Sequence, residues 1–154
     1  MSPAESDTFD DESHMQRAFE LAEIAVERGD RPFGAVLVRD DEIIMEDANA
    51  VNSETDIRRH PELHLAYLAC QEMTPDERAE TVMYASTMPC SMCARGMRKA
   101  GFGRLVYSVG DDEVTEFTGS NNKVSSTAIL EDITEVNGPV LNEEGRKLHE
   151  SFEY

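Results

Sequence analysis

The stretch that decides the fold is residues 81–109, TVMYASTMPCSMCARGMRKAGFGRLVYSV. Its apolar run at residues 81–86 predicts a strand, residues 90–100 predict a helix, and residues 104–109 predict a second strand. Two glycines, at positions 101 and 103, end the helix before that strand begins. A strand–helix–strand unit of this kind is the building block of α/β domains, so the fold class we expect is α/β.

The alternation of helices and strands continues on both sides of this unit. The elements expected before it are a helix at 14–28, strands at 33–38 and 42–46, a loop at 47–59 and a helix at 61–73. Those expected after it are a short helix at 111–119, an ambiguous segment at 128–137 with a candidate last strand at 133–136, and a helix at 141–153. Together they predict a three-layer α/β/α sandwich with a central mixed five-stranded sheet. Residues 1–13 are expected to form a disordered acidic leader, and residues 14–154 a single domain.

The composition excludes several classes of partner. The chain has 154 residues, with 32 Asp and Glu against 14 Lys and Arg, and a formal net charge of −18. A surface this acidic repels phosphate backbones and anionic lipids, so we expect no nucleic-acid partner and no membrane partner. Because 40% of the residues are hydrophobic, the chain still has enough apolar side chains to form a core.

Lysine occurs only at Lys99, Lys123 and Lys147. An acidic, lysine-poor surface is typical of proteins that stay soluble in molar salt, where charge repulsion reaches only ~3 Å. We therefore favour a halophilic protein over an ordinary acidic one. The chain begins with no secretory signal, and no apolar run approaches the ~20 residues of a spanning helix. These absences lead us to expect a cytoplasmic protein.

Two short segments carry the candidate chemistry, and each opens a predicted helix. They are His60-Pro61-Glu62 and Pro89-Cys90-Ser91-Met92-Cys93. In a reducing compartment, the Cys-x-x-Cys spacing indicates metal or redox chemistry rather than a structural disulfide. One His and two Cys suit zinc, and three protein ligands leave a fourth position open for water. Glu62, two residues after the His, is placed to take a proton from that water.

Two other interpretations of these residues stay open at this point. The two cysteines can form a redox pair without a metal. Alternatively, His64, one helical turn after His60, completes a closed Cys2His2 structural zinc site that has no water and no catalysis. That arrangement defines a different class of protein, a non-catalytic module, and it leaves Glu62 without a role.

The double motif resembles that of the zinc-dependent cytidine deaminase-like superfamily. The likeness extends over about residues 14–154 and is greatest to the branch that holds guanine deaminases, tRNA adenosine deaminases and cytosine deaminases. Four further positions support it: PFGAV at 32–36, Asn49, Asp56 and GFGRLVY at 101–107.

The chain departs from the family pattern at three positions. Pro61 replaces the usual Ala, Met88 stands where the family often has Glu, and Ile57 replaces a Pro. Proline is tolerated in a first helical turn, so we expect the ligand geometry to survive. None of these changes removes a ligand or the carboxylate of Glu62.

The resemblance implies a hydrolytic deaminase of cyclic amidines with one Zn²⁺ per subunit, bound by His60, Cys90 and Cys93. It implies that Glu62 moves the protons while ammonia leaves from the exocyclic amine of the substrate. A second catalytic candidate is Glu113. In an alignment without gaps from Tyr107, it falls at the position of an acidic residue that assists catalysis in the guanine deaminases. The candidate substrate-binding residues are Phe33, Asn49, Pro61, Pro89 and Tyr154.

Glu113 and Tyr154 favour a guanine-type purine base as the substrate, which would place the protein in purine metabolism. The alternative is cytosine or a nucleoside such as cytidine, adenosine or guanosine. A tRNA anticodon is least favoured, because a net charge of −18 repels RNA. The family also implies a homodimer. Candidate interface residues are Met92, Met97 and Phe102, although core packing is the commoner fate of such side chains.

Overall fold

The computed structural model describes residues 9–119 and 124–154. The strands are β1 (Gly34–Arg39), β2 (Glu42–Ala48), β3 (Val82–Thr87), β4 (Arg104–Val109) and β5 (Glu135–Asn137). The longer helices are α1 (Asp11–Glu27), α3 (Pro61–Glu72), α5 (Ser91–Ala100), α6 (Asp111–Thr118) and α8 (Asn142–Glu150). Three shorter helices are α2 (Val51–Glu54), α4 (Pro75–Ala79) and α7 (Ser126–Leu130).

The five strands form one mixed sheet in the order β2-β1-β3-β4-β5. β1 pairs antiparallel with both β2 and β3, whereas β3, β4 and β5 run parallel. The carboxyl ends of β3 and β4 therefore meet at one edge of the sheet, which is where α/β proteins commonly place their ligands.

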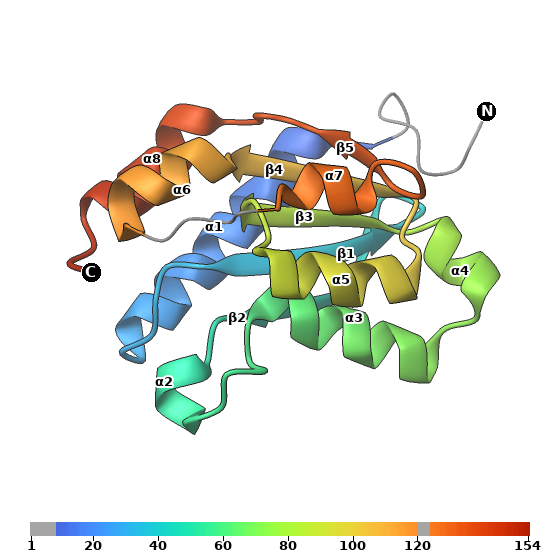
Figure 1. Ribbon diagram of the computed structural model, residues 1–154, viewed down its shortest axis with the longest axis horizontal. Coiled ribbons are helices and arrows are strands. Elements are labelled where there is room, and N and C mark those ends of the chain that lie inside the picture. Colours follow the sequence, from blue (N-terminus) through green and yellow to red (C-terminus); the bar gives the residue numbers. More distant parts are fainter. Residues whose placement is uncertain (1–8, 120–123) are drawn as a thin grey trace.

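Helices cover both faces of the sheet, which confirms the predicted three-layer sandwich (Figure 1). α1 and α8 lie on one face, and α3, α5 and α7 lie on the other (Figure 1). Because successive side chains of a strand point to opposite faces, β3 serves both cores. Tyr84 packs with the α1 side chains, while its neighbour Met83 packs with those of α3 and α5.

The N-terminal boundary differs from the prediction. α1 begins at Asp11 rather than at residue 14, because the side chain of Asp10 caps it by accepting a hydrogen bond from the Ser13 backbone N–H at 3.1 Å. Phe9 is also buried, so residues 9–13 belong to the folded domain and not to a leader. The rest of the predicted leader, residues 1–8, lies outside the described residues.

Three elements are missing from the prediction. α2, α4 and α7 have only four or five residues each, too few to show a helical period. The last strand is β5 at 135–137 rather than 133–136. Within the described residues, no helix combines the length and the apolar content needed to cross a bilayer.

Two of the three candidate interface residues are core residues instead. Met97 is 1% exposed and Phe102 is fully buried, both in the core between the sheet and α3 and α5. Met92 alone of the three stays exposed, at 41%.

Candidate metal centre and active-site pocket

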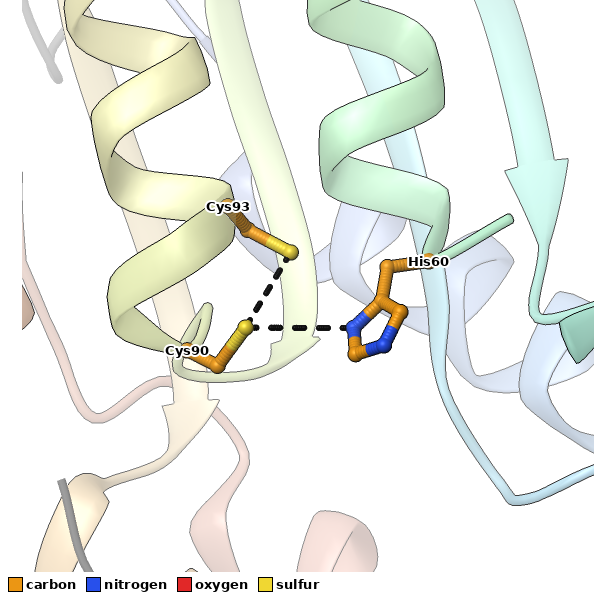
Figure 2. A group of neighbouring side chains, drawn as sticks. All are labelled: His60, Cys90 and Cys93. Atoms are coloured by element: carbon orange, nitrogen blue, oxygen red, sulfur yellow. Dashed lines mark hydrogen bonds between the residues drawn. The ribbon is translucent and has the colours of Figure 1, made fainter. Parts of the chain in front are cut away.

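The three predicted zinc ligands come together near the edge of the sheet where β3 and β4 end. Cys90 is the N-cap of α5, Cys93 lies in the first turn of α5, and His60 is the N-cap of α3. Because α3 and α5 pack side by side, their first turns bring the three side chains toward one another (Figure 2). The two Sγ atoms are 3.3 Å apart, and Sγ of Cys90 is 3.8 Å from Nδ1 of His60. All three ligand atoms lie within 4.8 Å of one another.

The chemistry of this donor set fits zinc. A hydrogen bond with the Cys93 thiol, and a second with His60, lower the pKa of Cys90 and so favour its thiolate. The start of α5 adds the partial positive charge of a helix N-terminus. Two sulfurs and one imidazole nitrogen are ligands that tetrahedral zinc accepts, with one position left for a water or substrate ligand.

The fourth ligand of a closed site is not in place. The ring of His64 stacks on Tyr67 at a centroid distance of 6.4 Å and lines a different cavity, of about 480 Å³. Within residues 9–119 and 124–154, the only group of side chains that could hold a metal is His60, Cys90 and Cys93. The closed Cys2His2 alternative is therefore not formed.

Glu62 lies in the first turn of α3, two residues after the ligand His60. Its side chain is 4% exposed, and it lines a cavity of about 140 Å³ together with His60 and Cys90. Burial, with the nearby charge of Cys90, raises the pKa of Glu62 to about 7. A carboxyl group with a pKa near neutrality can both take up and give back a proton, as general acid–base catalysis requires.

We call this 140 Å³ cavity the metal pocket. Its walls come from the loop before β1, the end of β3 with the segment after it, and one face of α6. The remaining lining residues are Arg31, Phe33, Thr87, Met88, Asp111, Val114, Thr115 and Thr118. An adjoining cavity of about 230 Å³ shares Arg31, Phe33 and His60 with the metal pocket. Asn49, Val51 and Asn52 line that second cavity.

The predicted substrate-binding residues separate into two groups. Phe33 lines both cavities, and the buried Asn49 lines the adjoining one, where its Oδ1 accepts a hydrogen bond from the Val51 backbone N–H at 3.1 Å. Pro61 and Pro89 line neither cavity. Pro61 instead occupies the first position of α3, while the Pro89 carbonyl accepts a hydrogen bond from Ser126 Oγ at 2.5 Å.

Glu113 is held away from the metal pocket. Its carboxylate caps α6 by accepting a hydrogen bond from the Gly110 backbone N–H, and it also accepts hydrogen bonds from Asn142 and Arg146 at 2.9 and 2.6 Å. Burial opposes ionisation, but the hydrogen bonds from Arg146, Gly110 and Asn142 lower the pKa of Glu113. It lines a larger cavity of about 540 Å³ that shares only Met88 and Asp111 with the metal pocket.

Tyr154 lies next to a pocket residue rather than in the pocket lining. Its ring stacks on His149 with centroids 5.9 Å apart, and its hydroxyl hydrogen-bonds Nδ1 of His149. The guanidinium carbon of Arg31 is 5.3 Å from the centroid of the Tyr154 ring. Tyr154 therefore does not line the metal pocket itself, but it contacts Arg31, which does.

Five polar residues of the metal pocket were not among the predicted site residues: Arg31, Thr87, Asp111, Thr115 and Thr118. Asp111 and Thr87 stand at the carboxyl ends of β4 and β3, so the position of those strand ends was an available signal. Arg31 had no comparable signal, because the loop that carries it is brought to the pocket by tertiary packing.

Comparison with known proteins supports the assignment of these residues to a zinc site. The family model described as the cytidine and deoxycytidylate deaminase zinc-binding region matches residues 8–109, which include His60, Glu62, Cys90 and Cys93. With the ligand group, this match identifies zinc as the cofactor.

Three curated relatives differ in the substrate that their names give. The guanine deaminase of Bacillus subtilis is 36% identical over 106 residues, covering 68% of each chain. The probable cytosine deaminase of Schizosaccharomyces pombe is 25% identical over 151 residues, covering 92% of this chain and 91% of the relative. A tRNA-specific adenosine deaminase of Agrobacterium fabrum is 32% identical over 97 residues, covering 63% of this chain and 64% of the relative.

A solved guanine deaminase from Nitrosomonas europaea shares the fold, with a TM-score of 0.78 at 20% identity, covering 90% of this chain and 82% of that one. The fold, the ligand group and the family match over residues 8–109 lead to one identification. The chain belongs to the cytidine and deoxycytidylate deaminase family.

Proposed function

We propose that this chain is a zinc-dependent hydrolase that releases ammonia from the exocyclic amine of a free nucleobase. The observation that carries the proposal is the position of Glu62. Its buried carboxylate lines the same 140 Å³ pocket as His60 and Cys90, two of the three zinc ligands. A structural zinc site has no use for a buried acid beside its ligands, whereas a hydrolytic site needs a group that transfers protons.

The residues in and around the pocket have separate roles in the proposed reaction. His60, Cys90 and Cys93 would hold the zinc ion, which when bound supplies Lewis-acid activation of water for attack on the amine-bearing ring carbon. Glu62 takes the proton of the attacking water on its carboxylate and passes it to the leaving amine. Phe33 offers an aromatic face to a planar base, and Asn49 lines the adjoining cavity with a side-chain amide that can donate and accept hydrogen bonds.

A guanine-type purine is the substrate we propose within this class. Two observations support it: the 36% identity to a guanine deaminase and a metal pocket that contains two carboxyl groups, Glu62 and Asp111, and one arginine. Cytosine or a nucleoside is the second candidate, because the S. pombe relative aligns over 92% of this chain. We disfavour a tRNA substrate, since a net charge of −18 opposes the approach of RNA.

The test combines metal analysis with a screen for released ammonia. The purified protein is expected to contain one equivalent of zinc and to release ammonia from guanine, with cytosine, adenine, cytidine, adenosine and guanosine assayed in parallel. Each assay is run at low and at molar KCl, because an acidic protein can need salt to stay folded. Bound zinc with no ammonia from any base or nucleoside would contradict the proposal and favour a non-catalytic module.

Assembly is a second property that we propose from family membership. We expect a homodimer, and sedimentation equilibrium of the zinc-loaded protein measures its mass. A monomer at micromolar concentration would contradict this expectation.

A further inference from the structure

Arg31 is the one arginine or lysine that lines the metal pocket among the described residues, and it also lines the adjoining cavity that contains Asn49. It lies in the loop between α1 and β1, two residues before Phe33, and its side chain is exposed at the rim. A cation at this position is notable in a chain with 32 acidic residues, because it places hydrogen-bond donors where a substrate enters.

The structure shows what holds Arg31 at the rim. Its guanidinium lies over the ring of Tyr154, at 5.3 Å from the centroid, and no described carboxylate forms an ion pair with it. Tyr154 hydrogen-bonds Nδ1 of His149, and Nε2 of His149 is 2.8 Å from Oγ1 of Thr87, another residue of the metal pocket. This chain of contacts fixes one wall of the pocket and leaves the guanidinium N–H groups available to a ligand.

A guanidinium presents two parallel N–H donors, so it pairs best with two acceptors that lie side by side. The O6 and N7 atoms of guanine are such a pair, and arginine is their commonest specific partner. Adenine offers a donor in place of O6, and cytosine has no equivalent edge. When the 2-amine of guanine faces the zinc ligands, its O6 and N7 edge points away from them, toward the outer part of the pocket.

We propose that Arg31 is a specificity-determining residue that pairs with the O6 and N7 edge of a 6-oxopurine. This inference rests on the proposed function and makes it narrower: the substrate class is a 2-amino-6-oxopurine, and cytosine and adenine are disfavoured. The two carboxyl groups of the pocket, Glu62 and Asp111, cannot supply this selection when ionised, since a carboxylate only accepts hydrogen bonds.

The test compares guanine with 2-aminopurine, which keeps the 2-amine and N7 but lacks O6. The variants are Arg31→Ala, Arg31→Lys and, as a matched control, Arg95→Ala, an exposed arginine of α5 that lines neither cavity. We expect Arg31→Ala to lower kcat/KM for guanine about 10- to 100-fold. We expect it to change kcat/KM for 2-aminopurine less than about threefold. Arg31→Lys should recover part of the loss and Arg95→Ala should behave as the wild type.

The comparison separates three kinds of failure. If the wild type deaminates guanine and Arg31→Ala has no effect, or lowers activity on both purines equally, the inference about Arg31 is overturned while the proposed function stands. If the wild type deaminates cytosine but not guanine, both the proposed guanine preference and the proposed role of Arg31 are overturned. If it deaminates no base, the proposed function itself is overturned.

Discussion

Glu62 is the residue on which the proposed chemistry depends most. We predict that Glu62→Gln keeps one equivalent of zinc but lowers kcat about 10²- to 10⁴-fold, because the amide fills the same space and cannot transfer protons. The measurements are zinc content by atomic absorption and the rate of ammonia release from guanine. The matched control is His64→Ala on the same helix, which should retain both zinc and activity because His64 lines another cavity. Loss of zinc from His64→Ala would instead support the closed Cys2His2 structural site.

Glu113 supports structure in the described geometry, so its replacement should affect stability more than catalysis. Its carboxylate joins the start of α6 to Asn142 and Arg146 of α8. We predict that Glu113→Gln lowers the free energy of unfolding by about 1–2 kcal/mol, the usual cost of losing charged hydrogen bonds. The kcat for guanine should stay within about threefold of the wild type, since Glu113 does not line the metal pocket. A 100-fold loss of kcat without loss of stability would restore the catalytic role expected from the family likeness.

The contact between α1 and β1 depends on Gly34, the glycine of the PFGAV stretch. A Cβ at this position would lie 2.2 Å from the Ala18 carbonyl oxygen and 2.6 Å from the Ala22 backbone nitrogen. Both are backbone atoms of α1, so the helix would have to move away from the sheet. We predict that Gly34→Ala lowers the free energy of unfolding by about 3 kcal/mol, measured by urea denaturation.

Gly96 of α5 is the matched control for this packing argument. A Cβ there would meet only the Leu63 side chain, with Cδ1 at 2.5 Å, and that side chain can rotate. Alanine also has the higher helix propensity, worth up to about 1 kcal/mol in a helix interior. Gly96→Ala should therefore change stability by less than about 1 kcal/mol. Equal losses for the two variants would show that a rigid backbone contact is not the cause.

α8 carries the most informative titratable group for pH dependence. His149 is 1% exposed, and burial lowers its pKa to about 4. Between pH 6.5 and 4 the unfolded chain binds a proton that the folded chain rejects, so the free energy of unfolding falls as the pH falls. One pKa unit is worth about 1.4 kcal/mol, which gives a loss of about 3 kcal/mol for this group.

Urea denaturation from pH 7.5 to pH 4 measures this loss, with His149→Gln as the comparison. Both proteins lose stability as their carboxylates are protonated, including Glu113 beside Arg146, so the difference between the two curves is the quantity of interest. We predict that the wild type falls more steeply than the variant. Parallel curves would show that His149 contributes nothing to the pH dependence.

Over the whole molecule, the sequence predicts best what depends on local pattern. The ligands His60, Cys90 and Cys93 were predictable because each lies at or next to a helix start, and a helix start fixes the side-chain direction within one turn. The sheet was predictable because four of its strands are apolar or alternating runs. The start of α1 was wrong because the cap Asp10 and the buried Phe9 precede the periodic apolar residues.

The remainder of the pocket depends on contacts between distant parts of the chain. Arg31 is held at the pocket by Tyr154, which also contacts His149, and His149 in turn contacts Thr87 at the end of β3. Glu113 is likewise held away from the metal pocket by a distant part of the chain, because α8 supplies its hydrogen-bond partners Asn142 and Arg146. No pattern within one segment encodes such contacts, so the outer part of the pocket required the folded structure.

The net charge of −18 leads to a prediction for the whole molecule. Repulsion between surface carboxylates destabilises the compact state, and screening weakens it as the Debye length falls from about 10 Å at 0.1 M salt to about 3 Å at 1 M. If the protein is adapted to high salt, Tm should rise by about 5 °C or more between 0.1 and 2 M KCl, which corresponds to roughly 1–2 kcal/mol of stability. Differential scanning calorimetry measures this change.

The decisive comparison is a variant in which the exposed Glu23, Glu27 and Glu42 become Lys. Each replacement reverses one charge and removes no buried side chain, so the fold should persist while repulsion decreases. We expect the variant to have a higher Tm than the wild type at 0.1 M KCl, and the two values to converge at 2 M, where screening has already removed most of the repulsion. A Tm that is flat with salt in both proteins would mean that the carboxylates are too far apart to repel strongly, and the protein would then be an ordinary acidic one.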